Sequence, residues 1–382
     1  MNKDNPSSWL KDSDVVAIVL RQYLRPIDGY DAPIFPPTFA MRPSSQQRHP
    51  YNIDTLSGGR NICLIDSIAS QSNRIEPIFD TFSPRMVPKV TVKVKSGKNE
   101  ESKSLLEIGH RVADAVIRFS DWAQTVSQAL LQYGKGDASS LARIAPTSIV
   151  FGAWNSRDGG EKIPRLVQST IRATNVDVLT RASQYVPPFD YKEVVDDKET
   201  PIIDPKTKND KLSGQGLLAV PVVTMPTKEK NKELAFRVHG GVLVNGDIRR
   251  DAAVNLVTLR AARAGAKSDD DNMHSYLLGL SLVALLYEQD FNLRQGCQLV
   301  LDPKRAEQRM KENEYGRYAL ALVKRDGTES GINLTYDDAR QYAENAARTF
   351  KITEDEKTVN FDAATMNAAI KTASIDTDAE EG

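Results

Sequence analysis

The sequence predicts a mixed fold of class α+β, and an α/β arrangement is also compatible with it. The segment Val87–Val94 alternates polar and apolar residues, which is typical of a half-buried strand. The segment Arg60–Phe79 instead repeats its apolar residues at helical spacing. Beyond them, predicted strands and helices interleave along the chain, so both element types must contribute to the core.

The first half of the chain begins with a β-branched run, Asp14–Arg21, which predicts a strand. Pro26–Pro50 holds six prolines and predicts an irregular loop. The helix predicted at Arg60–Phe79 follows, and then the strand Val87–Val94. A long helix is expected over Ser104–Leu131, because Ser104 can cap it and a glutamate stands three residues later.

The second half begins with two predicted strands, Ser148–Trp154 and Arg165–Leu179, separated by a glycine-containing turn. Val186–Glu233 is lysine-rich with spaced prolines, which indicates an extended excursion. The remaining predicted elements are the strand Leu234–Val244, the helices Asp247–Ala264 and Asn272–Glu288, the strand Cys297–Leu301, the helix Pro303–Asn313, the strand Tyr318–Lys324 and the helix Thr335–Phe350.

Composition excludes several classes of protein. The chain has 382 residues, of which 40% are hydrophobic and 26% charged, so it can bury a sizeable core and is not disordered throughout. Two cysteines cannot form a disulfide framework or a cysteine-rich zinc site. The longest apolar run, Tyr276–Tyr287, is shorter than the roughly 20 residues of a membrane helix. Because Met1–Leu10 is polar, we expect no signal peptide, no membrane contact and a cytoplasmic location.

The formal net charge of −1 conceals an uneven distribution along the chain. Arg85–Tyr185 holds 15 basic and 9 acidic residues, a net of +6, whereas Thr353–Gly382 holds 2 and 8, a net of −6. This pattern favours a body that binds a polyanion and a disordered acidic tail. Ordinary fluctuation of surface charge is the alternative explanation.

A polar stripe marks the helix predicted at Arg60–Phe79. Ser67, Ser70, Gln71 and Arg74 follow helical spacing, with Asn73 at the edge of the stripe. These side chains donate hydrogen bonds, and none of them is a carboxylate, so the stripe suits phosphate and ribose oxygens. A solvated helix face is the alternative.

Basic residues also follow the predicted strands. They are Arg165, Arg172 and Arg181 with Gln168 between them, then Gln184 and Tyr185, and Lys89 and Lys93 on a separate strand. Cations beside an aromatic ring predict a groove for single-stranded nucleic acid, in which phosphates meet the cations and a base stacks on the ring. A sheet with a merely solvated outer face is equally compatible with the pattern.

Catalytic motifs are scarce. His110 and Arg111 are adjacent and could provide an acid or base beside a phosphate-binding group, although a structural histidine is the commoner case. No Walker A, GxSxG or HExxH pattern occurs, and no histidine has metal-ligand spacing. The residues therefore predict anion binding, and we expect no catalytic residue, metal or cofactor.

Several segments, in this order, resemble the backbone RAMP subunit of the type I-G (formerly I-U) CRISPR Cascade complex. The resemblance extends over Val15–Lys324 and is most specific in the motifs SQSNR and IAPTSIVFG…PR…IRA…LTR. The segments that show it are Arg21–Gly29, Cys63–Phe79, Ser104–Asp121, Leu141–Tyr185 and Gly240–Ala261.

The resemblance implies an RRM-like, ferredoxin-like palm within a single RAMP domain at residues 1–352. It does not extend to the tail at 353–382, which is expected to be disordered from its charge and its lack of apolar periodicity. It implies a thumb at 186–233, with 26–59 as the alternative. Its implied partners are a CRISPR guide RNA, target DNA paired to that guide, neighbouring copies, other Cascade subunits and a recruited helicase-nuclease. Its type I members hold RNA without cleaving it.

Together, the residue patterns and the resemblance predict one RNA-binding set: Arg60, Ser67, Gln71, Asn73, Arg74, His110, Arg111, Arg165, Arg172, Arg181, Gln184, Tyr185 and Arg249. Two other functions stay open. One is a metal-independent RNA endonuclease with His110 or His239 as its base. The other is a structural oligomer in which the arginines pair with the acidic tail of a neighbour.

Overall fold

The computed structural model describes residues 5–40, 49–96, 99–157, 160–179, 240–265, 267–312 and 319–372, with a few short pieces between 184 and 221. Most of the predicted thumb at 186–233, and Arg181, therefore lie outside the described residues. Helices and strands both build the hydrophobic core, so the predicted mixed α+β class is confirmed.

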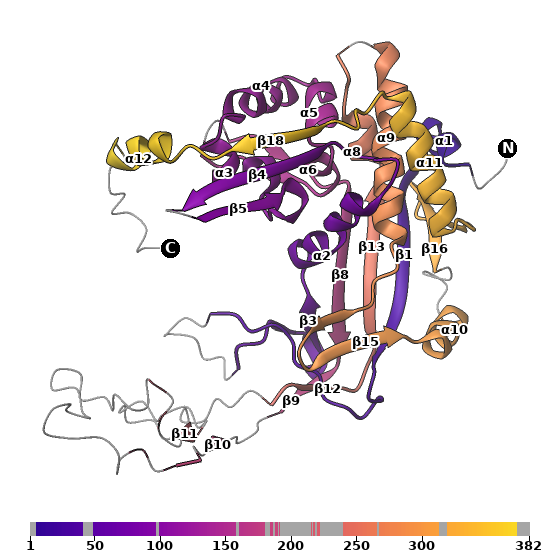
Figure 1. Ribbon diagram of the computed structural model, residues 1–382. Coiled ribbons are helices and arrows are strands. Elements are labelled where there is room, and N and C mark those ends of the chain that lie inside the picture. The colour runs from indigo at the N-terminus through magenta and orange to yellow at the C-terminus, as the bar shows by residue number, and fades with distance from the viewer. Residues whose placement is uncertain are drawn as a thin grey trace, which may run out of the picture.

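The main sheet is an antiparallel, twisted ribbon around the long strand β1 (Val15–Pro26) (Figure 1). Its strand order is β14-β15-β1-β13-β8-β3-β2. β1 pairs with β16 near its start and with β15 near its end. The other bounds are β2 Ile53–Thr55, β3 Asn61–Asp66, β8 Val167–Thr174, β13 Ile248–Asn255, β14 Asn292–Arg294, β15 Cys297–Leu301, β16 Leu320–Lys324 and β17 Glu329–Gly331.

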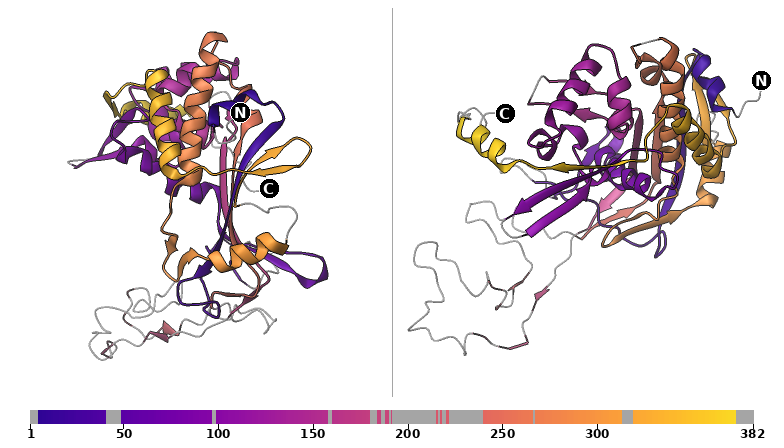
Figure 2. Two further views of the ribbon diagram at one scale, coloured as in Figure 1. Left: turned by 90° about the vertical axis from the view of Figure 1, so that its right-hand side faces the viewer. Right: turned by 45° about the horizontal axis from the view of Figure 1, so that its top comes forward.

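Helices cover one face of this sheet. α9 (Lys267–Leu286) and α2 (Ile68–Ile75) pack against β8, and α9 also contacts β13. α11 (Tyr336–Thr349) lies against α9, as the edge-on view of Figure 2 shows. A Cβ atom built on Gly279 of α9 would lie 2.7 Å from Ala343 Cα, so this helix pair needs a glycine at that contact. The opposite face of β8 and β13 is left open.

A smaller lobe joins the upper part of the sheet (Figure 1). Its three-stranded sheet has the order β18-β4-β5, formed by Glu356–Asn360, Lys89–Ser96 and Asn99–Ser104. Its helices are α3 Ala115–Arg118, α4 Ala123–Gly134, α5 Ser139–Ile144 and α6 Thr147–Val150, and α8 (Leu256–Ala261) packs between β1 and α9. The chain then ends its described part in α12 (Ala363–Thr372), which projects from the lobe.

The base of the sheet holds a second, smaller core cluster. There β9 (Val176–Val178) pairs with β12 (Val242–Val244), and α10 (Pro303–Glu312) lies beside the end of β1. The described part of the loop at 26–59 packs here, since Tyr51 is buried and its hydroxyl accepts a hydrogen bond from Gly241 N. The remaining short elements are α1 Pro6–Lys11, β6 Ala153–Trp154, β7 Lys162–Ile163, β10 Gln184–Tyr185, β11 Val220–Pro221 and 3₁₀ turns at Ser57–Gly59, Glu76–Thr81, Leu105–Glu107 and Arg111–Ala113.

Two predicted helices are wrong because strands take part of each. Arg60–Phe79 contains the strand β3, then α2, which starts at the cap residue Ser67. Asp247–Ala264 contains the strand β13, then α8. β13 lies between β1 and β8, and its residues alternate between buried and half-exposed. Pairing on both edges therefore overrides the helical preference of this segment.

Three further expectations need correction. The helix expected over Ser104–Leu131 is divided, because Ser104 caps only a 3₁₀ turn and Arg111 takes a positive φ of 55°. The strand expected at Ser148–Trp154 is only two residues long, β6 at its end, because the segment begins with the last three residues of α6. The tail predicted to be disordered is ordered as far as Thr372, since β18 pairs with β4 and buries Val359. Of the predicted strand Leu234–Val244, residues 234–239 lie outside the described residues, and Val242–Val244 forms β12. The other predicted strands and helices recur within about five residues of their expected bounds.

Candidate nucleic-acid interface

The open face of the sheet presents two rows of polar side chains. In the register of β8, β13 and β1, Arg249 lies opposite both Arg172 and Tyr23. Asp251 in turn lies opposite Thr170 and Arg21. Residues two apart on a strand point to the same face, so the two rows are adjacent on one surface.

This surface keeps an excess of positive charge. Arg249 Nε is 2.8 Å from Asp251 Oδ1, and Arg21 forms two hydrogen bonds with Glu329, the shorter of 2.6 Å. Although desolvation opposes it, contact with Tyr23 and Asp251 raises the pKa of Arg249 above its ordinary value. Among the described residues, the exposed Arg172 has no hydrogen-bond or ion-pair partner. Like charges directly opposite across two strands destabilise a sheet. Asp251 compensates the charge of Arg249, so Arg172 is the cation of this pair that can accept an anion.

A groove of 370 Å³ follows these rows. β1, β8 and β13 form its floor, and Ile68 at the first turn of α2 lies at its side. Its lining consists of Val19, Leu20, Arg21, Ile68, Gln168, Ser169, Thr170, Arg172, Arg249, Asp251, Ala252 and Ala253. The groove is open and elongated across three strands, which suits an extended ligand.

The first turn of α2 adds hydroxyl groups beside the groove. Ser67 is the N-cap of α2, and its hydroxyl accepts a hydrogen bond from Ser70 N. Asn73, one and a half turns further along α2, is exposed. It lies next to Gly109, because a Cβ atom built on that glycine would be 3.3 Å from Asn73 Nδ2. Asn73 and the exposed His110 therefore share one neighbourhood at the edge of the lobe.

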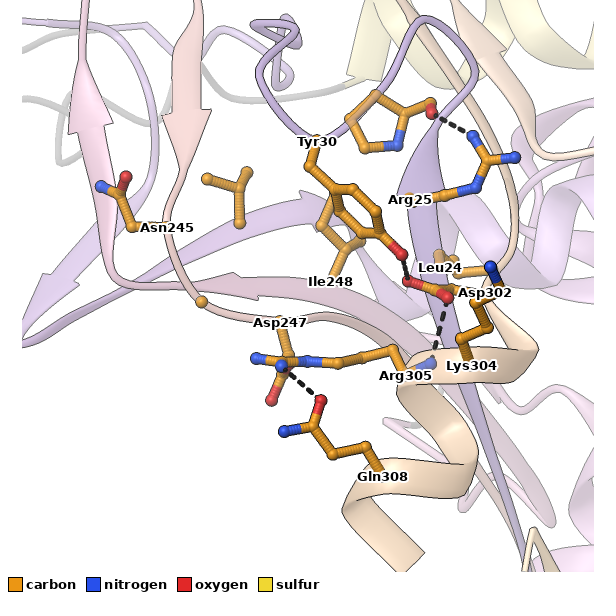
Figure 3. A pocket seen from close by; sticks show the side chains of 13 residues that line it. Leu24, Arg25, Tyr30, Asn245, Asp247, Ile248, Asp302, Lys304, Arg305 and Gln308 are labelled. Carbon is orange, nitrogen blue, oxygen red and sulfur yellow. Dashed lines mark hydrogen bonds and ion pairs between the residues drawn. The ribbon is translucent and has the colours of Figure 1, made fainter.

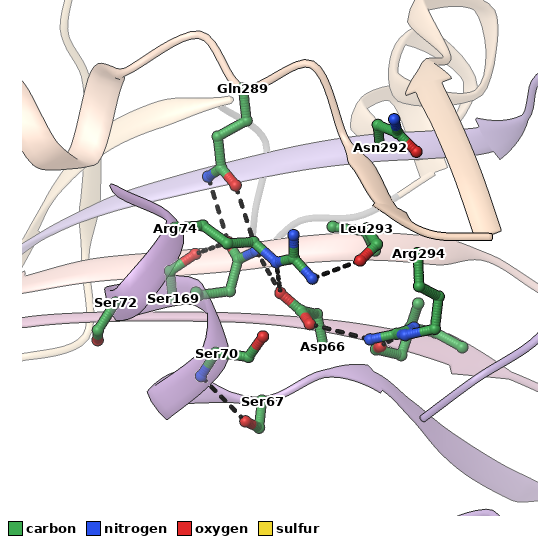
Figure 4. A network of polar contacts seen from close by, with 12 residues as sticks. Asp66, Ser67, Ser70, Ser72, Arg74, Ser169, Gln289, Asn292, Leu293 and Arg294 are labelled. Atoms are coloured by element: carbon green, nitrogen blue, oxygen red, sulfur yellow. Dashed lines mark hydrogen bonds and ion pairs between the residues drawn. The ribbon is translucent and has the colours of Figure 1, made fainter. Parts of the chain in front are cut away.

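The rest of the predicted helix stripe faces a buried carboxylate (Figure 4). Asp66 is fully buried and accepts hydrogen bonds from Gln71 Nε2 at 2.8 Å, Arg74 Nε at 3.1 Å and Arg294 Nη2 at 3.2 Å. Arg74 Nη2 also donates to the backbone oxygen of Leu293. No member of the stripe is itself a carboxylate, as the sequence shows. The expectation that the stripe is open to a ligand is wrong for Gln71, which is fully buried. Arg74 is half-buried and paired, with 33% of its side chain exposed.

This buried network continues on the face of the sheet that the helices cover. Arg250 is fully buried, and its Nε donates to Ser169 Oγ at 2.9 Å. Ser169 Oγ in turn donates to Gln71 Oε1 at 2.8 Å. Burial lowers the pKa of Arg250 to about 10, which leaves it charged at neutral pH. The network fixes α2 to β8 and β13, and so it sets the position of Ser67 and Ile68 at the groove.

Arg111 belongs to the interior and is a correction to the predicted site. Its Nε is 2.7 Å from Glu76 Oε2, and its Nη1 donates to Gly152 O at 3.0 Å. Burial raises the pKa of Glu76 to about 7, although the charge of Arg111 acts in the opposite direction. A ligand in solvent cannot reach this guanidinium, because only 3% of Arg111 is exposed.

The other predicted residues lie apart from the groove. Arg165 is half-buried, its Nε donates to Phe151 O at 2.9 Å, and burial lowers its pKa. Arg60 is exposed at the end of the 3₁₀ turn before β3. Gln184 and Tyr185 pair with β11 through their backbones. Of the predicted set, the structure therefore brings Arg172 and Arg249 together in the groove lining, while Ser67 directly precedes the lining residue Ile68.

A second hollow, of 400 Å³, lies at the end of β1 and was not foreseen from the sequence (Figure 3). Tyr30 projects over it, and its hydroxyl donates to Asp302 Oδ2 at 2.7 Å, which raises the tyrosine pKa. Lys304 and Arg305, from the first turn of α10, lie on the other side. Asp247 pairs with Arg305 at 2.5 Å and with Arg309 at 2.9 Å. The helix Pro303–Asn313 was predicted from the sequence, but the approach of Asp302 to Tyr30 depends on tertiary packing.

Metal-binding and membrane-spanning features can be judged for the described part of the chain. It contains no group of three or more histidine, cysteine, aspartate or glutamate side chains that could hold a metal ion. Within the same residues, no helix combines the length and apolar character needed to cross a membrane. The arginine-bearing groove is an open surface, and its exposed Arg172 suits an anionic ligand.

Comparison with known proteins connects the chain to CRISPR systems. The model of a family described as CRISPR-associated protein GSU0053 matches residues 18–178, a stretch that begins in β1 and ends in β9. No curated protein matches the chain. The matched segment contains β8 and α2, which supply Arg172 and Ile68 to the groove. This similarity supports a role in CRISPR defence.

Proposed function

We propose that this chain is a non-catalytic backbone subunit of a type I CRISPR Cascade complex, of subtype I-G, and that it binds the guide RNA. The main support from the structure is the pair Arg172 and Arg249, directly opposite each other on an open sheet face. The similarity of residues 18–178 to a CRISPR-associated family supports the biological setting.

The sugar-phosphate backbone of the RNA would lie along the groove. Arg172 would donate to one phosphate, and Arg249 would contact the next while keeping its ion pair with Asp251. Ile68, the residue after Ser67, lines the helix end of the same groove. Arginine and hydroxyl donors recognise phosphate and ribose whatever the base, as a subunit that accepts many guide sequences requires. Target DNA would then be recognised by base pairing with the guide.

The curved main sheet would be the RRM-like palm of this subunit. Many copies would line the guide side by side, beside other Cascade subunits, and a helicase-nuclease would act on the displaced DNA strand. Of the two predicted thumb segments, 186–233 is preferred, because the described part of 26–59 packs against the base of the sheet. The groove lining provides arginines, hydroxyls and one aspartate, which supports binding more than cleavage.

Binding of single-stranded RNA to R172Q/R249Q tests this proposal. We expect weaker binding and a salt dependence shallower by about 1 for each phosphate that the variant no longer binds. The matched control is R340Q, an exposed arginine of α11 that is 3.5 Å from Glu344. Equal affinity and equal salt dependence for both variants and the wild type would remove the groove from the RNA-binding site.

Incubation of the same protein with CRISPR repeat RNA in EDTA tests the alternative function. A subunit that only binds leaves the RNA intact. Cleavage that the exposed-histidine variant H110A abolishes would instead support the metal-independent endonuclease.

A further inference from the structure

The last described helix of the chain projects from the body with few contacts of its own (Figures 1 and 2). Contacts at the residues just before α12 fix the direction of this helix. Asp362 N donates to Phe119 O at 2.7 Å, and Phe361 forms an isolated bridge with Ser120. The Asp362 carboxylate then accepts hydrogen bonds from Ala364 N and Thr365 N in the first turn of α12. The start of α12 is therefore tied to the lobe, while the rest of the helix points away from it.

α12 presents an apolar stripe. Met366, Ala369 and Ile370 follow the spacing i, i+3 and i+4, so they share one face of the helix. Ile370 is 62% exposed, which is unusual for an isoleucine in an ordered helix. A helix of ten residues gains little stability from its own hydrogen bonds, and such helices are normally held by packing of their apolar face.

An apolar groove lies on the same lobe. It has a volume of 270 Å³ and runs between α3 and α4. Its floor is formed by Val112, Ile117, Val126 and Leu130, with Arg118 and Ser127 at its edges. A groove of this kind accepts the apolar face of a helix through side chains at i, i+3 and i+4.

We propose that α12 of one copy docks into this groove of a second copy. The chain carries both halves of the contact, a helix stripe that ends in the exposed Ile370 and an apolar groove. The fixed start of α12 directs the helix away from α3 and α4, which line its own groove (Figure 1). The contact joins two different surfaces, so it is head-to-tail, and each added copy leaves a further helix and a further groove available.

Charge complementarity favours the same arrangement. The sequence beyond α12 adds four carboxylates at Asp376, Asp378, Glu380 and Glu381. Arg118 lies at the edge of the groove, and Lys357 lies over the ring of Trp122 at the start of α4. A helix seated in the groove of a neighbour would bring its acidic extension toward basic side chains on that neighbour.

This inference deepens the proposed function, because it names the contact between copies, and it rests on that function for the RNA that aligns them. It is tested in the full chain, without RNA and with single-stranded RNA, by sedimentation. Ile370→Asp places a charge on the helix stripe, and Ser127→Trp fills the groove from an exposed position on α4. Ala364→Asp is the matched control, since it lies about 160° around the helix from Met366.

We expect the control to assemble like the wild type and each of the two variants to stay monomeric. An equimolar mixture of the two variants should give dimers and nothing larger, because the intact helix of one fits the intact groove of the other. Assembly of either variant at the wild-type level, or a mixture that stays monomeric while the wild type assembles, overturns the proposal.

Cross-linking identifies the partner even where assembly is weak. Copies carrying Ile370→Cys and copies carrying Ser127→Cys are mixed and treated with a short bismaleimide; the native Cys63 and Cys297 are buried. A cross-linked dimer supports docking between copies. A cross-link within one chain that carries both changes, or no cross-link at all, overturns it. Loss of RNA binding with the dimer retained would instead count against the proposed function alone.

Discussion

Arg111 offers the sharpest test of which predicted residues bind RNA and which support the fold. The change is Arg111→Met, which keeps the length of the side chain and removes its charge. Glu76 then loses its partner at 2.7 Å while remaining buried. Where Glu76 is ionised, above about pH 7, removing its partner in a buried ion pair costs about 3–5 kcal/mol, because the carboxylate charge is left without compensation.

The pKa of Glu76 predicts the direction in which the cost of Arg111→Met changes with pH. The pKa of Glu76 is raised to about 7 in the folded protein, above its ordinary value, so the folded state binds the extra proton. This contribution to stability is fully present below about pH 4.5 and is lost as pH rises through 7, a loss of about 3 kcal/mol. Without Arg111 the pKa rises further. The cost of Arg111→Met should therefore be larger at pH 8 than at pH 6.

Urea unfolding at pH 6 and pH 8 measures these values, and RNA binding is measured on the fraction that stays folded. The double variant E76Q/R111M should recover part of the stability, since it buries no uncompensated charge. We expect the folded variants to bind RNA as the wild type does. A variant with unchanged stability and abolished RNA binding would refute the structural role of Arg111.

Three other predictions concern the framework that positions the groove. Arg250→Met leaves Ser169 and Gln22 without their buried donor and should cost about 2–4 kcal/mol in urea unfolding; an unchanged midpoint would contradict the network. Gly279→Ala forces α9 and α11 apart and should lower the free energy of unfolding by about 1–3 kcal/mol. A lower Tm in thermal unfolding would show this loss. Removing residues 353–382 deletes β18 and should destabilise the lobe, as faster amide exchange in β4 would show, whereas removing 373–382 should leave that exchange unchanged.

Much of the framework could be predicted from local sequence patterns. The alternation in Val87–Val94 identified β4, whose Val90 and Val92 are buried as expected. The apolar run around Tyr276 identified α9, which is buried on almost every side. These predictions succeed because an alternating pattern indicates directly that a strand buries one well-defined face, as β4 does. A continuous apolar run indicates in the same way that a helix is buried on almost every side, as α9 is.

The site could be predicted only in part. The arginines Arg172 and Arg249 were recognised as candidates, yet β13 was expected to be a helix, so their direct cross-strand pairing was not foreseen. Arg111 and Gln71 were expected on an accessible face, but long-range partners bury them. A sequence window contains no information about Glu76 and Asp66 approaching these side chains, because the approach depends on packing between separate elements.

The sequence by itself determined the mixed class of the fold, most of the strands and helices, and the excess of cations in its middle section. The tertiary structure alone decided which of those cations stay exposed, because exposure depends on the carboxylates and carbonyls that distant elements bring near each guanidinium. As a result, Arg111 is buried beside Glu76, whereas Arg172 stays exposed on the open sheet.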